Sequence, residues 1–572
     1  MTTDQPPTLD AVLRRRAAEL PDHVVYRFLA DGETESEAWT YAALDRKARA
    51  LAVRLLSLGR PGETVLLLYE TGLEPLAAFF GCLSAGMLAV PLAAPRPRQP
   101  LAALAAVAAD AGASVVLTSQ ALLARHAADP AVAHLRWLAT DALPVDDAAA
   151  AGWQPPATRA TDAAVLLYTS GSTSQPKGVI LSHKTLWGPT FQMPEGVDPE
   201  WTLNGIGWMP LHHLSGLNIA LLPLRVGRGT EVRLPAERVT AQPLVWLRAI
   251  SRYRALLAGG PNFLFQACVD RVTPAERAGL DLSLWMFAPC FSEPLRAETL
   301  EQFIAAYEPA GFQPWAFLPN YGLSELPAVT VRAGMRPTRI AAFDRAALAQ
   351  NRVTPAPADA PGAIRLVSNG RVAEGVSARL VDPASDTACP PGQVGEIWVT
   401  GPFTASGYWR RPAATAATFG ARLADSGEGP FVRTGDLGFL YEDELYICGR
   451  LKDMLIIRGH NVYAEDIEAA AAGAHPQLGA GAAAFGVPAP GGGEQAVLYQ
   501  EVRAELDAAA LDVEAVSAAI RRAVARELQI ALHAVVLVPA GGLPRTGVGK
   551  IPRFAVREAF LAQRAASATQ PD

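Results

Sequence analysis

A loop rich in glycine and hydroxyl residues carries the strongest chemical signal in this 572-residue sequence. It runs Thr169-Ser-Gly-Ser-Thr-Ser-Gln-Pro-Lys-Gly178 and follows an apolar run, residues 164–168, that predicts a buried strand. Backbone N–H groups and hydroxyls in such a loop close around phosphate oxygens, and Lys177 adds a positive charge. An ordinary Ser/Thr/Gly turn is the alternative. The spacing is not that of P-loop nucleotide hydrolases, because no lysine directly follows a second glycine.

Four more segments in the second half of the chain place charged residues beside glycine. They are Tyr321-Gly-Leu-Ser-Glu325, Arg433-Thr-Gly-Asp436, Gly449-Arg-Leu-Lys-Asp453 and Pro544-Arg-Thr-Gly-Val-Gly-Lys550. With the loop, they resemble in order the motifs of the acyl-adenylate-forming ligases, which include acyl-CoA synthetases, peptide-synthetase adenylation domains and luciferases. One segment alone could arise by chance, but five in order indicate membership of this superfamily.

The resemblance implies that a carboxylate attacks the α-phosphorus of ATP, releasing pyrophosphate and forming an acyl adenylate. Catalytic roles would fall to Lys550, which bridges the carboxylate and the α-phosphate, to Glu325, which holds Mg²⁺, and to Thr169. Lys452 would be the hinge between a large and a small domain. The other positions implied to bind ATP are Ser170, Gly171, Ser172, Thr173, Lys177, Ser292, Asn320, Tyr321, Gly322, Ser324, Asp436 and Arg450.

Within the superfamily the sequence is most similar to the fatty acyl-AMP ligases. Phe79-Phe-Gly-Cys-Leu83, Gly259-Gly-Pro-Asn-Phe263 and Ile456-Ile-Arg-Gly-His-Asn461 are similar to segments of that branch. Residues 343–361 lie where these ligases carry an insertion that acyl-CoA synthetases lack. This implies acyl transfer to the phosphopantetheine thiol of a separate acyl carrier protein. The small domain is then expected to turn about Lys452, withdrawing Lys550 and admitting the pantetheine arm.

Two segments depart from the family pattern where it faces the acyl group. His213 matches, but Leu214 replaces an aspartate, and Phe291 replaces a glycine. A benzyl group in place of hydrogen is a large volume change in a tight pocket, so Phe291 is predicted to shorten or redirect the acyl tunnel. Local repacking away from the substrate and a degenerate enzyme are the alternatives. The predicted substrate pocket consists of His213, Gly216, Phe263, Cys290 and Phe291.

The adjacent pair His212 and His213 could suggest a metal site. Neighbouring residues of a strand point to opposite faces, however, and no acidic partner follows them. We therefore expect His213 to form a wall of the pocket or a polar contact to the acyl adenylate.

The elements that must position these residues alternate along the first part of the chain. Helical spacing occurs over 41–59, 76–85 and 101–111, and short apolar runs that predict buried strands occur over 63–69, 87–92 and 114–118. Such alternation predicts an α/β fold with parallel sheets. Residues 140–160 are predicted to be a surface connection.

The later part of the chain shows two further patterns of predicted secondary structure. Residues 360–448 predict strands separated by turns, and residues 464–474 and 511–528 predict helices around a strand at 495–499. We therefore predict a large N-terminal adenylation domain of α/β subdomains plus a β-rich subdomain at about 360–448, followed by a small mobile C-terminal α/β domain. The predicted boundaries are 1–451 for the adenylation domain and 452–572 for the small domain.

Composition and charge exclude several other classes of protein. The chain has 50 basic and 56 acidic residues, a net charge of -6 and no long basic run, which argues against nucleic acid or anionic lipid as a partner. Five cysteines without CxxC spacing argue against disulfides and zinc and favour a reducing compartment. Residues 1–21 lack the apolar core of a signal peptide, and no apolar run is long enough to span a membrane. A cytoplasmic protein without membrane insertion is expected.

The leading hypothesis is a fatty acyl-AMP ligase that loads a separate acyl carrier protein in lipid or natural-product biosynthesis. An acyl- or aryl-CoA synthetase is the enzymatic alternative, and an acyl-AMP-binding protein is the non-enzymatic one. Carrier proteins are commonly acidic, so docking would need a local basic patch. We predict that patch on the small domain, from Arg521, Arg522, Arg526, Arg553 and Arg557.

Overall fold

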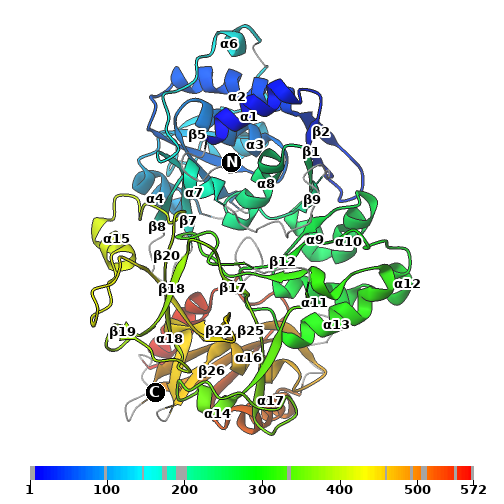
Figure 1. Cartoon of the computed structure of the whole chain (residues 1–572), viewed down its shortest axis with the longest axis vertical. Helices are drawn as coiled ribbons and strands as arrows, with labels where there is room; N and C mark the ends of the chain where they lie inside the picture. Colours follow the sequence, from blue (N-terminus) through cyan, green and yellow to red (C-terminus); the bar gives the residue numbers. More distant parts are fainter. Residues whose placement is uncertain are drawn as a thin grey trace.

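A six-stranded sheet carries the glycine- and hydroxyl-rich loop in the computed structural model (Figure 1). The described residues are 7–95, 100–144, 147–169, 177–188, 203–331, 336–457, 460–489, 494–503, 512–545 and 551–568. The strand order is β6 (Arg136–Ala139), β5 (Val115–Thr118), β3 (Thr64–Tyr69), β4 (Leu88–Ala93), β7 (Ala163–Thr169) and β8 (Lys177–Ser182). All neighbours are parallel except β7 and β8, which form an antiparallel hairpin.

Helices cover both faces of this sheet, which explains why its strands are continuously apolar. Val65 and Leu67 of β3 belong to a core shared with α2 and α3, whereas Leu66 and Leu68 face α4 on the other side. Gly81 lets α3 approach α2, because a Cβ there would lie 2.7 Å from a methyl carbon of Leu51. The helices are α1 (Leu9–Glu19), α2 (Tyr41–Leu56), α3 (Glu74–Ser84), α4 (Ala102–Ala111), α5 (Gln120–His126), α6 (Asp147–Gly152) and α7 (His183–Trp187).

A second sheet carries the predicted acyl-binding residues at one edge. Its order is β11 (Leu257–Ala258), β9 (Leu203–Gly207), β10 (Gly229–Arg233), β1 (Val24–Phe28) and β2 (Glu37–Thr40), parallel from β11 to β1. A short parallel pair, β12 (Ala288–Cys290) and β13 (Phe317–Pro319), continues beside it. The helices of this part are α8 (Leu214–Val226), α9 (Ala236–Ala241), α10 (Pro243–Arg252), α11 (Asn262–Arg271), α12 (Pro274–Arg277) and α13 (Ala297–Tyr307).

Residues 360–448 contain the β-rich part that the sequence predicts. Five antiparallel strands lie in the order β19 (Thr387–Ala388), β18 (Ser377–Asp382), β20 (Gly395–Thr400), β21 (Val432–Tyr441) and β22 (Glu444–Arg450). Two small antiparallel pairs adjoin them, β14 (Thr330–Val331) with β17 (Arg371–Val372) and β15 (Ile340–Asp344) with β16 (Ala363–Val367). Two helices, α14 (Arg345–Leu348) and α15 (Pro412–Phe419), lie in the connections.

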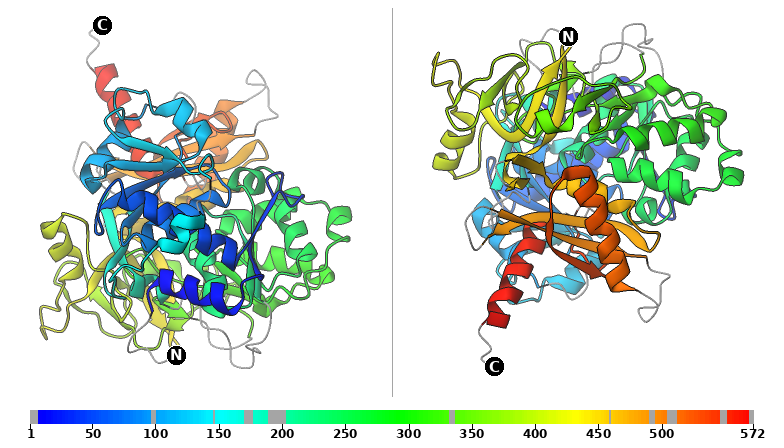
Figure 2. Two further views of the ribbon diagram at one scale, coloured as in Figure 1. Left: turned by 90° about the horizontal axis from the view of Figure 1, so that it is seen from above. Right: turned by 90° about the horizontal axis from the view of Figure 1, so that it is seen from below.

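The C-terminal segment forms a sheet with helices on both faces (Figure 2). Its strands are, in order, β25 (Leu478–Pro488), β26 (Glu494–Val502) and β27 (Leu532–Val538), and a separate antiparallel pair is formed by β23 (Met454–Ile457) and β24 (His460–Tyr463). One core joins the sheet to α16 (Ala464–Ala472) and α17 (Val513–Leu528), and another joins its opposite face to α18 (Arg553–Ala568). The orange and red helices of Figure 2 are therefore separated by the strands.

The connection predicted at 140–160 is more ordered than expected. It contains α6, which contacts α2, and Trp153, which is 8% exposed and donates its indole N–H to the Ser84 carbonyl. The alanine- and proline-rich composition of this segment did not predict its packing, because a single residue, Trp153, attaches it to the large core. In the described part of the chain, no helix is both long and apolar enough to cross a bilayer.

Candidate functional site

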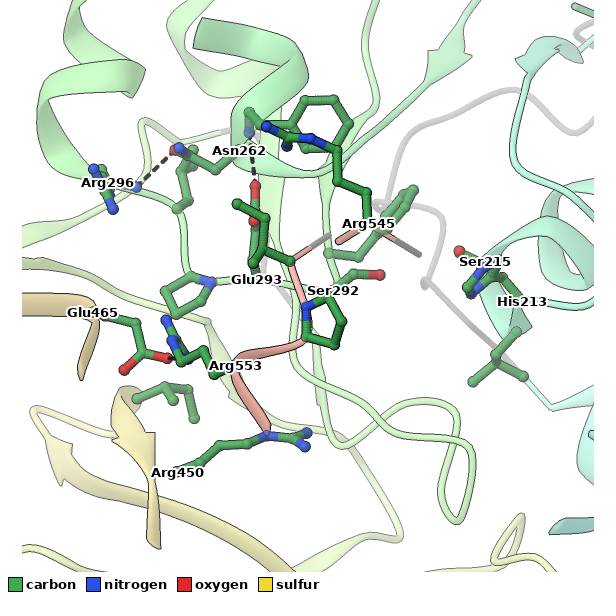
Figure 3. Close-up of a pocket in the computed structure, with 18 of the residues that line it drawn as sticks. His213, Ser215, Asn262, Ser292, Glu293, Arg296, Arg450, Glu465, Arg545 and Arg553 are labelled. Atoms are coloured by element: carbon green, nitrogen blue, oxygen red, sulfur yellow. Dashed lines mark hydrogen bonds and ion pairs between the residues drawn. The ribbon is translucent and has the colours of Figure 1, made fainter. Parts of the chain in front are cut away.

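A cleft of about 3590 Å³ receives the carboxyl ends of β10 and β11 and extends to the C-terminal segment. Ligands of open α/β sheets bind at this edge, where the strands end. Figure 3 shows Ser292 and Glu293 in its middle, with His213 and Ser215 on one side and Arg450 on another. The cleft therefore collects side chains from regions that are far apart in sequence.

The glycine- and hydroxyl-rich loop joins β7 to β8 beside this cleft. Thr169 and Lys177 are the last pair of the hairpin, and Lys177 lines the cleft. The predicted ligands Ser170, Gly171, Ser172 and Thr173 lie outside the described residues, as does the side chain of Thr169. The hairpin thus places the end of the loop at Lys177 in the wall of the cleft.

Glu325, Tyr408 and Lys177 form a chain of contacts at the base of this loop. The Tyr408 hydroxyl donates a hydrogen bond to Glu325 Oε1 at 2.7 Å, and Lys177 Nζ lies 5.2 Å from the centroid of the Tyr408 ring. Burial, together with the Glu325 carboxylate, raises the pKa of Tyr408, so its hydroxyl stays protonated and donates. Sequence reasoning missed Tyr408 because its partner is 83 residues away and no motif marks it.

The residues around Glu325 suit a magnesium ion that is shared with phosphates. Protein-bound Mg²⁺ is commonly held by one or two carboxylates plus substrate phosphates. Glu325 supplies one carboxylate to the cleft, and only its Oε1 is hydrogen-bonded within the described residues. Within the described ranges, no group of three or more His, Cys, Asp or Glu side chains is arranged to hold a metal ion.

Asp436 and Arg450 meet across neighbouring strands and also line the cleft. They are register partners of β21 and β22, and Arg450 Nε lies 2.9 Å from Asp436 Oδ1. The other carboxylate oxygen accepts a 2.7 Å hydrogen bond from the Tyr321 hydroxyl. Burial raises the pKa of Tyr321, and the Asp436 carboxylate raises the pKa of Arg450. Two residues predicted to bind ATP are thus held together as one unit.

The remaining predicted nucleotide contacts lie on turns that border the cleft. Gly322 is required sterically, because a Cβ there would lie 2.3 Å from the Pro327 carbonyl oxygen. Ser292 adopts a φ of 70°, which directs the chain sharply after β12. All of these residues line the cleft: Ser292, Asn320, Tyr321, Gly322 and Ser324.

The two histidines lie side by side in the turn before α8. Their ring centroids are 4.6 Å apart and both line the cleft. The expectation that they point to opposite faces was wrong, because this segment is a turn and not a strand. Burial, and His213 beside it, lower the pKa of His212 to about 3, and burial lowers the pKa of His213 to about 4. Both rings are therefore neutral near pH 7.

Of the predicted acyl-pocket residues, Phe263 and Phe291 line the cleft along with His213. Phe291 packs against an apolar cluster that includes Ile219, Leu222 and Leu257. Gly216 and Cys290 are not in the cleft wall. Cys290 is 2% exposed, and burial raises the pKa of its thiol.

Gly216 is required sterically at its position beside the cleft. A Cβ at this position would lie 2.0 Å from the Pro210 carbonyl oxygen and 2.7 Å from that of Met209. The first turn of α8 can therefore lie directly on the turn that carries the histidines, which fixes the position of His213.

The predicted catalytic Lys550 lies outside the described residues. Lys452 is exposed in a 3₁₀ turn, Leu451–Asp453, at the edge of the cleft. Arg553 comes three residues after Lys550 in the sequence. Its guanidinium lies 3.2 Å from Asp453, 2.6 Å from Glu465 and 2.6 Å from Glu468. Arg553, the first residue of α18, thus joins α16 to the residue that follows Lys452, and Figure 3 shows its contact with Glu465.

The predicted basic docking patch does not form a single surface. Arg521, Arg522 and Arg526 are exposed on α17, whereas Arg553 and Arg557 are half-buried on α18. The two helices cover opposite faces of the sheet. Arg553 is also occupied by its three carboxylates, so the patch is reduced to the residues of α17.

Comparison with known proteins agrees with this geometry. The model of the family "AMP-binding enzyme" matches residues 13–409. A medium-chain-fatty-acid–[acyl-carrier-protein] ligase of Moorena producens is 41% identical over 568 residues, covering 97% of this chain and 95% of that protein. A long-chain-fatty-acid–AMP ligase of Mycolicibacterium smegmatis is 35% identical over 595 residues, covering 96% and 94%.

Solved structures are similar over almost the whole chain. One, from work on the fatty acyl-adenylate ligases of E. coli and L. pneumophila, has a TM-score of 0.85 and 28% identity and covers 99% of this chain and 100% of its own. A fatty acid AMP ligase of Legionella pneumophila has a TM-score of 0.75 and 33% identity and covers 100% and 97%. The α/β fold predicted from the sequence is confirmed by these likenesses.

Proposed function

We propose that this chain activates a fatty acid with ATP and transfers the acyl group to a separate acyl carrier protein. The premise is its family, because the chain belongs to the AMP-binding enzymes that form acyl adenylates. The observation that carries the proposal is that two groups of interacting side chains line one cleft. The contacts of Lys177 with Tyr408 and of Tyr408 with Glu325 lie at the end of the glycine- and hydroxyl-rich loop. The cluster of Tyr321, Asp436 and Arg450 lines the same cleft. The relative at 41% identity supports a medium-chain acid and a carrier protein.

In the first step a carboxylate oxygen forms a bond to the α-phosphorus and the bond to pyrophosphate breaks. The transition state gathers negative charge on phosphate oxygens, so fixed positive groups accelerate it mainly by electrostatics. Lys177 is held at the loop by its hairpin, and Lys550 would bridge the two reactants. Mg²⁺ at Glu325 would supply charge neutralisation between phosphate oxygens when bound. Asp436 and Arg450 would orient the ribose.

In the second step the carrier's thiolate attacks the acyl carbonyl and AMP leaves. The neutral His213 is suited to a polar contact with the acyl adenylate and not to charge stabilisation, because its pKa is about 4. Phe291 and Phe263 would exclude water from the mixed anhydride.

The test of the function is ATP–pyrophosphate exchange over a panel of acids, followed by mass detection of the product. With ATP and acid present, acyl transfer to a phosphopantetheinylated carrier protein is expected to exceed transfer to CoA. Steady CoA-dependent AMP release without a carrier would instead identify a CoA synthetase. Nucleotide binding without pyrophosphate release would identify an acyl-AMP-binding protein.

The insertion at 343–361 contacts the C-terminal segment and supports the preference for a carrier. Arg345 lies 3.6 Å from Asp466, and the Asn461 side chain donates a 2.9 Å hydrogen bond to that of Asn351. The Asn461 backbone N–H also donates to the Ala349 carbonyl at 3.1 Å. These contacts restrain the small domain against the large one.

Arg345→Ser with Asn351→Ala is expected to raise CoA-dependent product about 5- to 30-fold relative to carrier-dependent product. Losing one ion pair and one hydrogen bond weakens the restraint by about 1–2 kcal/mol. Product ratios with competing CoA and carrier protein measure the effect, and ATP–pyrophosphate exchange should stay unchanged as the control. An unchanged ratio would remove this role of the insertion.

Phe291→Gly is expected to shift the preferred chain length of the acid upward. Removing the ring frees the wall formed with Ile219, Leu222 and Leu257, and each added methylene in an apolar pocket gains up to about tenfold in kcat/KM. The measurement is exchange kinetics over a series of straight-chain acids. If the wild type already prefers long straight chains, or if the variant keeps the same optimum, Phe291 does not limit the tunnel.

We also propose that the reaction uses Mg²⁺, takes place in the cytoplasm and serves natural-product or lipid biosynthesis. The single carboxylate of Glu325 in the cleft supports the metal. The five cysteines, which are all free in the structure, support a reducing compartment. Loss of exchange on chelation and its recovery with added Mg²⁺ would test the metal.

A further inference from the structure

A sharp turn after β12 carries side chains toward two different parts of the cleft wall. Its residues are Phe291, Ser292 and Glu293, all of which line the cleft, and the φ of Ser292 is 70°. Phe291 packs against the apolar cluster on the acyl side. Glu293 instead reaches α11, the helix whose second residue is Phe263 (Figure 3). One turn therefore contacts both aromatic residues of the acyl side.

The first turn of α11 receives from Glu293 a hydrogen bond that its own sequence cannot supply. The residue before this helix is Pro261, whose side chain has no acceptor atom and makes no capping bond. Glu293 Oε1 accepts a 2.7 Å hydrogen bond from the backbone N–H of Phe263, 30 residues away in the sequence. The first N–H groups of a helix have no partner within it, and a carboxylate is favourable there. Glu293 thus supplies the cap that α11 lacks locally.

A second hydrogen bond crosses between the same two segments in the opposite direction. The Asn262 side chain, which is 9% exposed, accepts at 3.0 Å from the backbone N–H of Arg296, the residue before α13. One helical turn further on, the Thr299 hydroxyl donates to the side chain of Gln266 at 2.7 Å. Figure 3 shows the bonds of Glu293 and Asn262 side by side. The start of α11 is therefore fixed to the turn and to α13.

Phe263 is the side chain that this arrangement places in the cleft wall. Its ring is half-buried and meets the ring of Trp208 edge to face, with 6.5 Å between the centroids. Trp208 is 1% exposed, and its indole N–H donates to the Gly259 carbonyl at 2.9 Å. The Phe263 ring thus lies against a fixed neighbour, and its backbone is held by Glu293.

We propose that Glu293 is a positioning residue that determines which acyl chains are accepted, because it fixes Phe263 in the cleft wall. The proposal rests on the proposed function and concerns the choice of acid in its first step. Phe291 is joined to the same turn through the backbone, so Glu293 sets the position of one aromatic side chain relative to the other. Loss of the cap would let the first turn of α11 shift, and Phe263 would discriminate less between chain lengths.

The experiment measures kcat and KM in ATP–pyrophosphate exchange over a series of straight-chain acids. Glu293→Leu removes the acceptor and should reduce the preference for the best acid over the poorest about tenfold, through KM for the acid. KM for ATP should stay close to the wild-type value. Glu293→Gln keeps an oxygen that can accept the hydrogen bond and should retain the preference. A merely structural loss would lower the rate with all acids alike.

A double-mutant cycle tests whether Glu293 acts through Phe263. Phe263→Ala should weaken the same preference, and adding it to Glu293→Leu should cause little further change. Glu293→Ala also removes the acceptor and replaces Glu293→Leu if leucine disturbs the fold. Glu298→Gln is the matched control and should keep the preference, because Glu298 lines the cleft but is 61% exposed and pairs with Arg365.

An unchanged preference in the variants that lack the acceptor would overturn the proposal. So would a preference lost in Glu293→Gln as fully as in Glu293→Leu, because the hydrogen bond would then not be the cause. Fully additive effects of Glu293→Leu and Phe263→Ala would show that the carboxylate acts independently of the ring, which also contradicts it. Absence of exchange by the wild type with every acid would instead contradict the proposed function itself.

Discussion

Lys550→Ala is expected to slow acyl-adenylate formation about 10²- to 10³-fold while leaving ATP binding close to normal. The lysine would contact the attacking carboxylate and the α-phosphate at once, so its charge matters most when negative charge peaks between them. In the proposed mechanism, binding of ATP in the ground state would rely mainly on the glycine- and hydroxyl-rich loop, on Asp436 and on Arg450. The loss should therefore appear in kcat and much less in the affinity for the nucleotide.

The measurement is ATP–pyrophosphate exchange at saturating acid, with nucleotide affinity determined separately by calorimetry. Lys184→Ala is a matched control, because Lys184 lies in α7 and is not part of the cleft wall. Transfer from chemically prepared acyl-AMP to the carrier should also survive in Lys550→Ala, since the lysine serves only the first step. Near-normal exchange by this variant would contradict the assignment.

Glu325→Gln is expected to lower adenylation about 10²-fold and to raise the Mg²⁺ concentration needed for half-maximal rate. The amide keeps the size of the side chain but removes the charge that attracts the ion. Tyr408→Phe should also lower the rate of adenylation, but only by about tenfold or less. This change removes the hydrogen bond that orients the Glu325 carboxylate and leaves its charge in place.

The double variant separates the two roles. If Tyr408 acts through Glu325, adding Tyr408→Phe to Glu325→Gln should cause little further loss, which a double-mutant cycle measures directly. Nucleotide-free thermal unfolding of each variant controls for damage to the fold. Strictly additive losses would show that Tyr408 acts independently, and an unchanged Mg²⁺ dependence in Glu325→Gln would remove the metal role.

The secondary structure of the large domain could be predicted because its strands are buried on both faces. The runs at 63–69, 87–92 and 114–118 correspond to β3, β4 and β5, and the helical spacing at 41–59 corresponds to α2. Continuous apolar runs and helical periodicity both survive in the sequence of such elements. The turn at His212 was misjudged as a strand, because a short segment after β9 has no periodicity to distinguish the two.

The candidate site was predictable where the chemistry is local in sequence and hidden where it is not. Glu325 and Asp436 stand in short motifs with glycine, and both reach the cleft. Tyr408 has no such motif, since its contact with Glu325 depends on the fold. Gly216 stood in a recognisable segment, yet its function is steric and became visible only with the Met209 and Pro210 carbonyls in place.

The contacts of Arg553 have a mechanical consequence for the reaction cycle. Asp453 is the first residue after the predicted hinge Lys452, and Arg553 comes three residues after the predicted catalytic Lys550 in the sequence, so the Arg553 guanidinium connects the neighbours of both lysines. Glu465 and Glu468 stiffen that connection from α16. In the proposed rotation about Lys452, these ion pairs would couple the residue after the hinge to α16 and to the start of α18, so that the three would move as one body.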